Sequence, residues 1–213
     1  AEIRLPEIIT RQDAADGTVK WMLKAGTAAG ATPGASQGVE MVYIPEEGRS
    51  TLCISSQVGC AMDCSFCSTA QQGFNSNLST AEIVGQVLLA QKELGFKAGD
   101  DRIISNVVLM GMGEPLANFR NVVPALRILL DELGLDFSRR RLTLSTSGLV
   151  PQIYKLAEES NVALAVSLHA PDDELRNELV PINRRHNIAE LLEACWAYID
   201  EANGRSITFD YVM

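Results

Sequence analysis

The sequence of 213 residues has no long hydrophobic run and no excess of positive charge. None of its apolar segments approaches the roughly 20 residues that span a bilayer, and the N-terminal stretch AEIRLPEIIT lacks the basic and apolar regions of an export signal. Its 18 basic and 27 acidic residues give a net charge of −9, which argues against nucleic-acid binding through a global positive field. We therefore expect a chain that is neither membrane-bound nor exported.

Cysteine is scarce as well, with five residues, and five is an odd number. Three of them fall within CAMDCSFC, residues 60–67, which is too tight a group for a spread disulfide framework. Such frameworks belong to oxidising compartments. A metal or redox role in a reducing compartment is favoured, and we expect a cytoplasmic protein.

Positive charge is concentrated in two short clusters. SRRRL contains Arg139, Arg140 and Arg141, and NRRHN contains Arg184, Arg185 and His186. Both fall in predicted connections, where a solvated loop is the commoner explanation and a phosphate contact is the alternative.

From Arg49 onward, apolar strand patterns alternate with helical patterns. The predicted strands are residues 50–57, 104–113, 140–148, 161–170 and 206–213, and the predicted helices are residues 79–95, 121–134, 149–160 and 187–204. Ser79 or Thr80 and Gly95 fit the ends of the first helix, and Asn187 and Gly204 those of the last. This alternation predicts an α/β fold with a parallel sheet that is buried on both faces and has right-handed crossovers.

The first 48 residues follow a different pattern. TVKWMLKAG and GVEMVYIPEE are strand-like and are separated by the small-residue stretch TAAGATPGASQ, so we expect a β-hairpin with a long flexible loop. We predict an N-terminal hairpin extension at 1–48 and an α/β core at 49–213. The core stops on a strand with no covering helix, which suggests a piece of a longer protein.

The unusual residues follow the predicted strands. The cysteines come after the first strand, GMGEP after the second, STSG after the third and SLHAP after the fourth. Because function gathers at the carboxyl ends of parallel strands, we expect these segments to form one site.

The spacing of Cys60, Cys64 and Cys67 is C-x3-C-x2-C. Structural zinc, the main alternative, usually takes four ligands in two separated pairs, and the sequence has no second pair. Cys195 lies in the apolar helical segment LLEACWAYI, where a buried inert thiol is the commoner reading. Three thiolates without a fourth ligand match a four-iron cluster with one open iron.

With this motif the sequence resembles the radical S-adenosylmethionine (SAM) superfamily. The resemblance implies a partial (β/α) barrel, a [4Fe-4S] cluster on Cys60, Cys64 and Cys67, and SAM chelated by the open iron and cleaved to a 5′-deoxyadenosyl radical. Four segments narrow the resemblance to the RlmN family, which methylates C2 of adenosine in large-subunit ribosomal RNA and in transfer RNA. They are residues 51–78, 107–118, 140–151 and 162–183.

The resemblance assigns roles that spacing does not. It implies SAM contacts at Gly113, Glu114, Ser145, Ser167, Leu168 and His169. Taken alone, these residues would fit a glycine turn, serines bonded to backbone and a structural histidine. It also makes Cys53 a catalytic thiol and Glu40 a proton acceptor, where the pattern alone favours a buried strand thiol and an exposed strand carboxylate.

The family mechanism implied by the resemblance uses two SAM molecules. One methylates a carrier cysteine, a radical from the second abstracts hydrogen from that methyl group, and the RNA adduct is resolved with disulfide formation. The resemblance implies ribosomal and transfer RNA substrates, an electron donor such as flavodoxin, and a monomer. No cysteine follows Cys195 and the family's N-terminal RNA-binding domain is missing, so we expect an inactive fragment.

Two other functions remain open from the sequence. One is the sister family that methylates C8 of the same ribosomal adenosine. The other is an iron–sulfur or zinc module without turnover.

Overall fold

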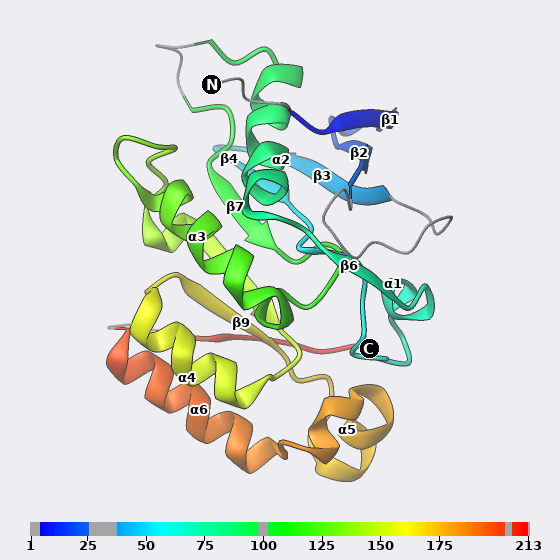
Figure 1. Cartoon of the computed structure of the whole chain (residues 1–213), viewed down its shortest axis with the longest axis vertical. Coiled ribbons are helices and arrows are strands. Elements are labelled where there is room, and N and C mark those ends of the chain that lie inside the picture. Colours follow the sequence, from blue (N-terminus) through cyan, green and yellow to red (C-terminus); the bar gives the residue numbers. More distant parts are fainter. Residues whose placement is uncertain (1–4, 26–37, 98–101, 203–205, 213) are drawn as a thin grey trace.

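The computed structural model describes residues 5–25, 38–97, 102–202 and 206–212 (Figure 1). These residues form an eight-stranded sheet in the order β1-β2-β3-β4-β7-β8-β9-β10 and a two-stranded sheet, β5-β6. The strands are β1 (Glu7–Asp13), β2 (Val19–Lys24), β3 (Gly38–Glu46), β4 (Arg49–Cys53), β5 (Gln57–Gly59), β6 (Phe74–Asn77), β7 (Asn106–Leu109), β8 (Leu142–Thr146), β9 (Ala163–Ser167) and β10 (Thr208–Asp210). The helices are α1 (Ser68–Gln71), α2 (Thr80–Glu93), α3 (Phe119–Leu130), α4 (Val150–Glu159), α5 (Asp173–Leu179) and α6 (Ile188–Glu201), with short 3-10 helices η1 (Pro115–Asn118), η2 (Arg139–Arg141) and η3 (Pro181–Arg184).

The large sheet is mostly parallel. Strands β4, β7, β8, β9 and β10 run parallel to one another, and β1 to β4 are joined by antiparallel pairs. This mixed α/β architecture confirms the predicted fold class. The carboxyl ends of all five parallel strands meet at one edge of the sheet.

The helix signals read from the sequence are confirmed where the structure describes them. Ser79 caps α2 in a capping box with Glu82, and Gly95 follows the helix with a positive φ of 80°. Asn187 caps α6 by accepting the backbone N–H of Glu190 at 2.9 Å. Gly204 lies outside the described residues. No helix in the described ranges has the length and hydropathy needed to cross a membrane.

The N-terminal strands β2 and β3 form the predicted antiparallel pair, and the predicted loop between them, 27–37, falls outside the described residues. Strand β1 was not predicted, because its mostly polar segment EIITRQD lacks an apolar pattern. One hydrophobic core joins Trp21 and Met41 of the N-terminal strands to Leu144 and Leu164 of the parallel strands. The division at residue 48 stays a prediction.

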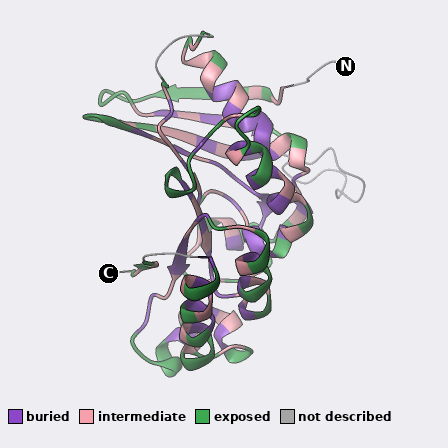
Figure 2. Ribbon diagram, turned by 90° about the vertical axis from the view of Figure 1, so that its left-hand side faces the viewer, coloured by how far each residue is buried: buried purple, intermediate pink, exposed green. Residues whose placement is uncertain are grey.

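The two faces of the sheet are covered unequally, which corrects the expectation of a sheet buried on both sides. The helices lie on one side of the strands, and no helix of the described residues forms a layer on the opposite side (Figure 2). Residues facing the helices, such as Leu52, Leu109 and Leu144, are at most 1% exposed. On the uncovered face the residues are mostly half-buried, among them Thr51, Cys53, Val108, Thr143, Ser145 and Ser167.

Candidate functional site

A cavity of about 280 Å³ lies at the carboxyl ends of the parallel strands. Its lining comprises Cys60, Met62, Cys64, Phe66, Cys67, Leu109, Met110, Gly111, Gly113, Glu114, Pro115, Ser145, Thr146, Ser147, Ser167, His169 and Asp210. The volume is close to the roughly 300 Å³ at which small-molecule pockets begin. The structure therefore brings together the segments that the sequence places after four different strands.

The cysteine loop, residues 60–67, is held between β5 and α1. Cys60 follows β5 directly and donates its backbone N–H to the carbonyl of Gly73 at 3.1 Å. Gly59 has a φ of +73°, and a Cβ there would lie 1.8 Å from the same carbonyl oxygen, so only glycine fits this approach. Cys67 caps α1 with its backbone. One end of the loop is thus held beside the β5-β6 sheet and the other at the start of α1.

The three thiols of the loop line one cavity. Burial raises the pKa of Cys60 and raises that of Cys64 to about 12, so both are thiols at neutral pH until a metal displaces their protons. Within the described residues, no three His, Cys, Asp or Glu side chains are grouped closely enough for one metal ion. Because an iron–sulfur cluster distributes its cysteines over separate iron atoms, three thiols around one cavity suit that group.

Glu114 lines the cavity and is held in place by hydrogen bonds. Only 3% of the residue is exposed, and its carboxylate accepts the backbone N–H of Leu116 at 2.9 Å and both the N–H and hydroxyl of Ser147 at 2.7 and 2.9 Å. Burial raises its pKa, while these hydrogen bonds act in the opposite direction. The carboxylate is therefore fixed in place before any ligand arrives.

Gly113 allows the loop before Glu114 to pass close to β5. Its φ is +96°, and a Cβ would lie 2.4 Å from the Cβ of Gln57. The buried side chain of Gln57 accepts the backbone N–H of Glu114 at 2.8 Å and donates to Asn77 at 2.8 Å. The glycine-rich loop is thereby connected to both strands of the small sheet.

His169 has an unsatisfied polar atom beside the cavity. Its Nδ1 is buried and has no hydrogen-bond partner among the described residues, which is costly unless a ligand supplies one. The ring contacts Phe66 edge to face, with centroids 4.6 Å apart, and burial lowers the pKa of the imidazole. This unsatisfied nitrogen, with the half-buried Ser145 and Ser167 on the same wall, fits a polar ligand such as SAM.

Leu168 does not line the cavity. Its backbone contributes instead: its N–H donates to the carbonyl of Asp210 at 3.2 Å, and its carbonyl accepts Nε of Arg176 at 3.0 Å.

Cys53 and Glu40 lie on the uncovered face but outside this cavity. Cys53 pairs with Val42 across the β3–β4 ladder, so Glu40 is its diagonal neighbour on the same face, at a spacing of roughly 7–8 Å between Cα atoms. Burial raises the pKa of Cys53 to about 11. Glu40 pairs with Lys20 at 2.6 Å and lines a second cavity of about 460 Å³.

A single hydroxyl joins the backbones of Glu40 and Met112, which both line the second cavity. Ser55 donates its hydroxyl to the carbonyl of Glu40 at 2.6 Å and accepts the N–H of Met112 at 2.8 Å. Sequence reasoning did not identify Ser55, Gln57, Ser147 or Arg176. For Ser55 and Ser147 the available signal was their position, since polar residues just after apolar strands are buried here.

The basic clusters lie at different ends of the fold. Arg139–Arg141 form η2, which immediately precedes β8 and so lies at the end of that strand away from the cavity. Arg184 ends η3 and Arg185 follows it, in the segment after α5. At both clusters the phosphate contact stays the untested alternative to a solvated loop.

Comparisons with known proteins agree with this geometry. The family profile of the radical SAM superfamily matches residues 54–210. The chain is 53% identical over 214 aligned residues to proteins called dual-specificity RNA methyltransferase RlmN from Francisella tularensis subsp. novicida (strain U112) and subsp. mediasiatica (strain FSC147). It also resembles the crystal structure of a radical SAM methyltransferase from Sphaerobacter thermophilus, with a TM-score of 0.86 and 43% identity over 98% of this chain and 58% of that one.

The matches to the Francisella proteins cover all of this chain but 55% of each relative. The chain therefore spans about half the length of the curated relatives that it matches. The resemblance to the RlmN family found in the sequence is confirmed over the whole chain.

Proposed function

Because the chain belongs to the radical SAM superfamily, we propose that it carries the catalytic core of a methyltransferase that acts on C2 of adenosine in large-subunit ribosomal RNA and in transfer RNA. The observation that carries the proposal is the single cavity in which three cysteines face Glu114 and the ends of β8, β9 and β10. The identity of 53% to RlmN proteins supports the substrate class.

Cys60, Cys64 and Cys67 would hold a [4Fe-4S] cluster, which supplies the electron for reductive cleavage of bound SAM. Their loop is fixed at Gly59 and at the start of α1, so the thiols are held in position by the backbone. Phe66 and Met62 from the same loop cover the cavity with apolar surface, which limits water near a reactive ligand.

The residues opposite the cysteines would bind the methionine and ribose parts of SAM. Glu114 contributes a fixed negative charge suited to an ammonium group, and Gly113 exposes backbone beside it. Ser145, Ser167 and Nδ1 of His169 contribute hydrogen-bonding groups from two neighbouring strands.

Glu40 and Cys53 would act on the RNA adduct. Since burial keeps Cys53 protonated at neutral pH, a base must take its proton before the thiol attacks. Glu40 lies on the same face of the sheet and is proposed as the acceptor of the proton that is lost when the adduct is resolved. The family mechanism also uses a carrier cysteine and forms a disulfide on resolution, and no cysteine of this chain is assigned the carrier role. The five cysteines of this chain are all free thiols.

Further features of the family are proposed with the function. An electron donor such as flavodoxin would reduce the cluster, the substrates would place the protein in the cytoplasm, and the protein would act as a monomer.

The test is the position of the methyl group on the RNA. The full-length protein, reconstituted without oxygen, is incubated with SAM, a reductant and transcripts of ribosomal and transfer RNA. Mass spectrometry of the digested nucleosides should find 2-methyladenosine from both. 8-Methyladenosine would assign the sister activity instead, and no methylated adenosine would contradict the proposal.

A further inference from the structure

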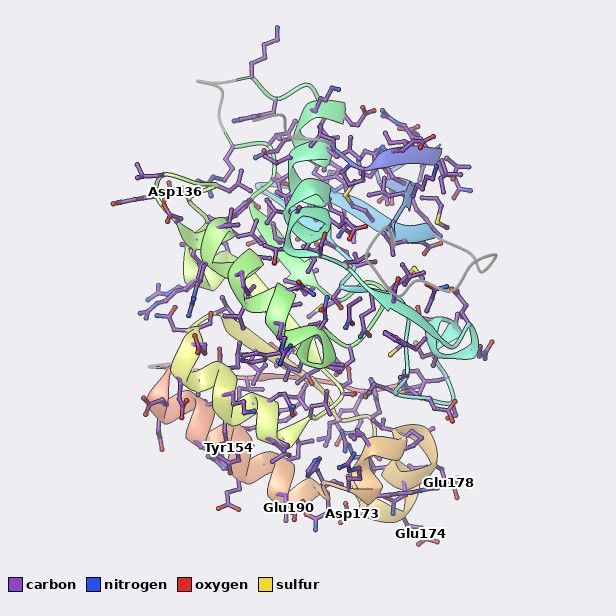
Figure 3. All side chains as sticks on the ribbon, viewed as in Figure 1. Asp136, Tyr154, Asp173, Glu174, Glu178 and Glu190 are labelled. Atoms are coloured by element: carbon purple, nitrogen blue, oxygen red, sulfur yellow. The ribbon has the colours of Figure 1, made fainter. Side chains whose placement is uncertain are left out.

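Arg176 is a completely buried charged residue that no part of the proposed function uses. It lies on α5, has 0% exposure and is among the largest fully buried side chains of the described residues. The carboxylates of Glu174 and Glu178 on the same helix point away from the body of the protein (Figure 3). Arg176 therefore enters the protein from a helix whose acidic side chains face solvent.

The guanidinium group joins the ends of two neighbouring strands. Its Nη2 donates to the carbonyls of Ser147 at 2.7 Å and Ser167 at 3.1 Å. Nε donates to the carbonyl of Leu168 at 3.0 Å, and Nη1 to Oδ1 of Asn183 at 2.8 Å. Ser147 and Ser167 both line the cavity, so one side chain sets the spacing of its β8 and β9 walls.

All four acceptors of these hydrogen bonds are neutral. Among the described residues, the ionisable groups within electrostatic reach include Cys64, Asp173, Cys195 and His169. Oδ1 of Asp173 is bonded instead to Asn183 and to the N–H of Ile188. Burial lowers the pKa of the guanidinium, yet arginine stays charged at neutral pH. A buried charge without an opposite charge in contact is costly, so an anionic group at Cys64 would stabilise it.

The α5 segment also holds the cysteine loop directly. The backbone N–H of Ser65 donates to the carbonyl of Leu179, the last residue of α5, at 3.1 Å. The ring contact between Phe66 and His169 also connects the loop to the end of β9. The charge of Arg176 is thus placed behind the loop by a segment bonded to that loop.

We infer that Arg176 is a positioning residue with two effects: it fixes the β8 and β9 walls of the cavity, and it places a positive charge beside the Cys64 corner of the iron–sulfur cluster. The inference rests on the proposed function for the presence of the cluster. A three-cysteine cluster is anionic and gains one negative charge on reduction. A fixed positive charge stabilises the reduced form more, so it raises the reduction potential.

Two substitutions separate the effect of the positive charge of Arg176 from the effect of its hydrogen bonds to the two strand ends. Arg176→Gln removes the charge and leaves an amide that can still donate to a strand-end carbonyl. Arg176→Lys keeps a charge next to the anionic cluster but cannot make the forked contacts to two strands. Arg49→Gln is the control, because Arg49 is an exposed arginine paired with Glu46 at the opposite end of β4 from Cys53.

The measurement is a redox titration of the cluster followed by EPR, with iron content, thermal unfolding and SAM affinity on the same samples of the full-length protein. Arg176→Gln should lower the ratio of reduced to oxidised cluster at a fixed potential by about tenfold, which is a midpoint 59 mV more negative for a one-electron couple. Arg176→Lys should keep the wild-type midpoint and bind SAM at least tenfold more weakly. Arg49→Gln should match the wild type in both.

An iron-loaded Arg176→Gln protein with the wild-type midpoint potential would overturn this inference but not the proposed function. If that variant cannot be loaded, Arg176→Lys decides: a shifted midpoint, or unchanged SAM affinity, would overturn it. A wild-type protein that takes up no cluster, or whose cluster ignores SAM, would overturn the proposed function and this inference with it.

Discussion

The carboxylate of Glu114 is bonded twice to Ser147, through the backbone N–H at 2.7 Å and the hydroxyl at 2.9 Å. Glu114 follows β7 and Ser147 follows β8, so this pair joins the ends of two adjacent strands beneath the cysteine loop. The site is therefore built before its cofactors bind, by hydrogen bonds between strand ends.

Replacing Glu114 tests that connection. Glu114→Gln substitutes an amide for a charged acceptor of several hydrogen bonds and should lower the free energy of unfolding by about 2 kcal/mol, with weaker SAM binding. Ser147→Ala removes the hydroxyl and keeps the backbone contact, so it should cost about 1 kcal/mol. Urea unfolding measures both, and equal losses in the two variants would contradict the account.

Gly113 in the glycine-rich loop and Gly95 after α2 allow a matched pair of substitutions. Gly113 and Gly95 both have positive φ, but a Cβ at Gly95 meets nothing within 4 Å, whereas one at Gly113 would lie 2.4 Å from Gln57. Gly95→Ala should therefore cost only backbone strain of about 1 kcal/mol. Gly113→Ala should cost at least about 3 kcal/mol and abolish SAM binding, because the loop must move. Similar unfolding midpoints for the two variants would refute the close approach.

The sequence predicted the parallel strands and their helices well because Val, Ile and Leu runs alternate with capped amphipathic segments. It did not predict β5 and β6, whose segments QVG and FNSN are too short and polar to show a strand pattern. The grouping of Cys60, Glu114 and His169 in one site was predicted, because the carboxyl ends of parallel strands lie at one edge of the sheet. The role of Arg176 could not be predicted, because a helical arginine shows its burial only when the chain folds around it.

The pKa of Cys53 predicts a pH dependence. A thiol has an ordinary pKa of 9.0, and burial raises that of Cys53 to about 11. The neutral thiol is favoured in the folded state, so its contribution to stability is complete below pH 9 and is lost as the pH rises toward 11. Metal-free wild type should lose more stability between pH 8.5 and 10.5 than Cys53→Ala, in unfolding curves recorded about every half unit. Parallel pH profiles for both proteins would argue against a buried thiol at this position.

Substitutions in the ion pair of Glu40 and Lys20 distinguish a catalytic role of Glu40 from a structural one. Both side chains are more than one third exposed, so Glu40→Gln should change the free energy of unfolding by less than about 1 kcal/mol. The same substitution in the full-length protein should slow product release by at least a hundredfold if Glu40 accepts the proton, with RNA remaining attached to the protein. Lys20→Gln is the control and should retain turnover. Equal loss of turnover in both variants would assign Glu40 a structural role.

Anaerobic reconstitution followed by EPR tests the central claim most directly. Wild type and Cys195→Ala should bind iron and sulfide as a four-iron cluster, and the signal of the reduced cluster should change when SAM is added, because one iron remains open to the ligand. Cys60→Ala, Cys64→Ala and Cys67→Ala should each lose that signal. Zinc without iron in the wild type, or a cluster whose EPR signal does not respond to SAM, would contradict the account.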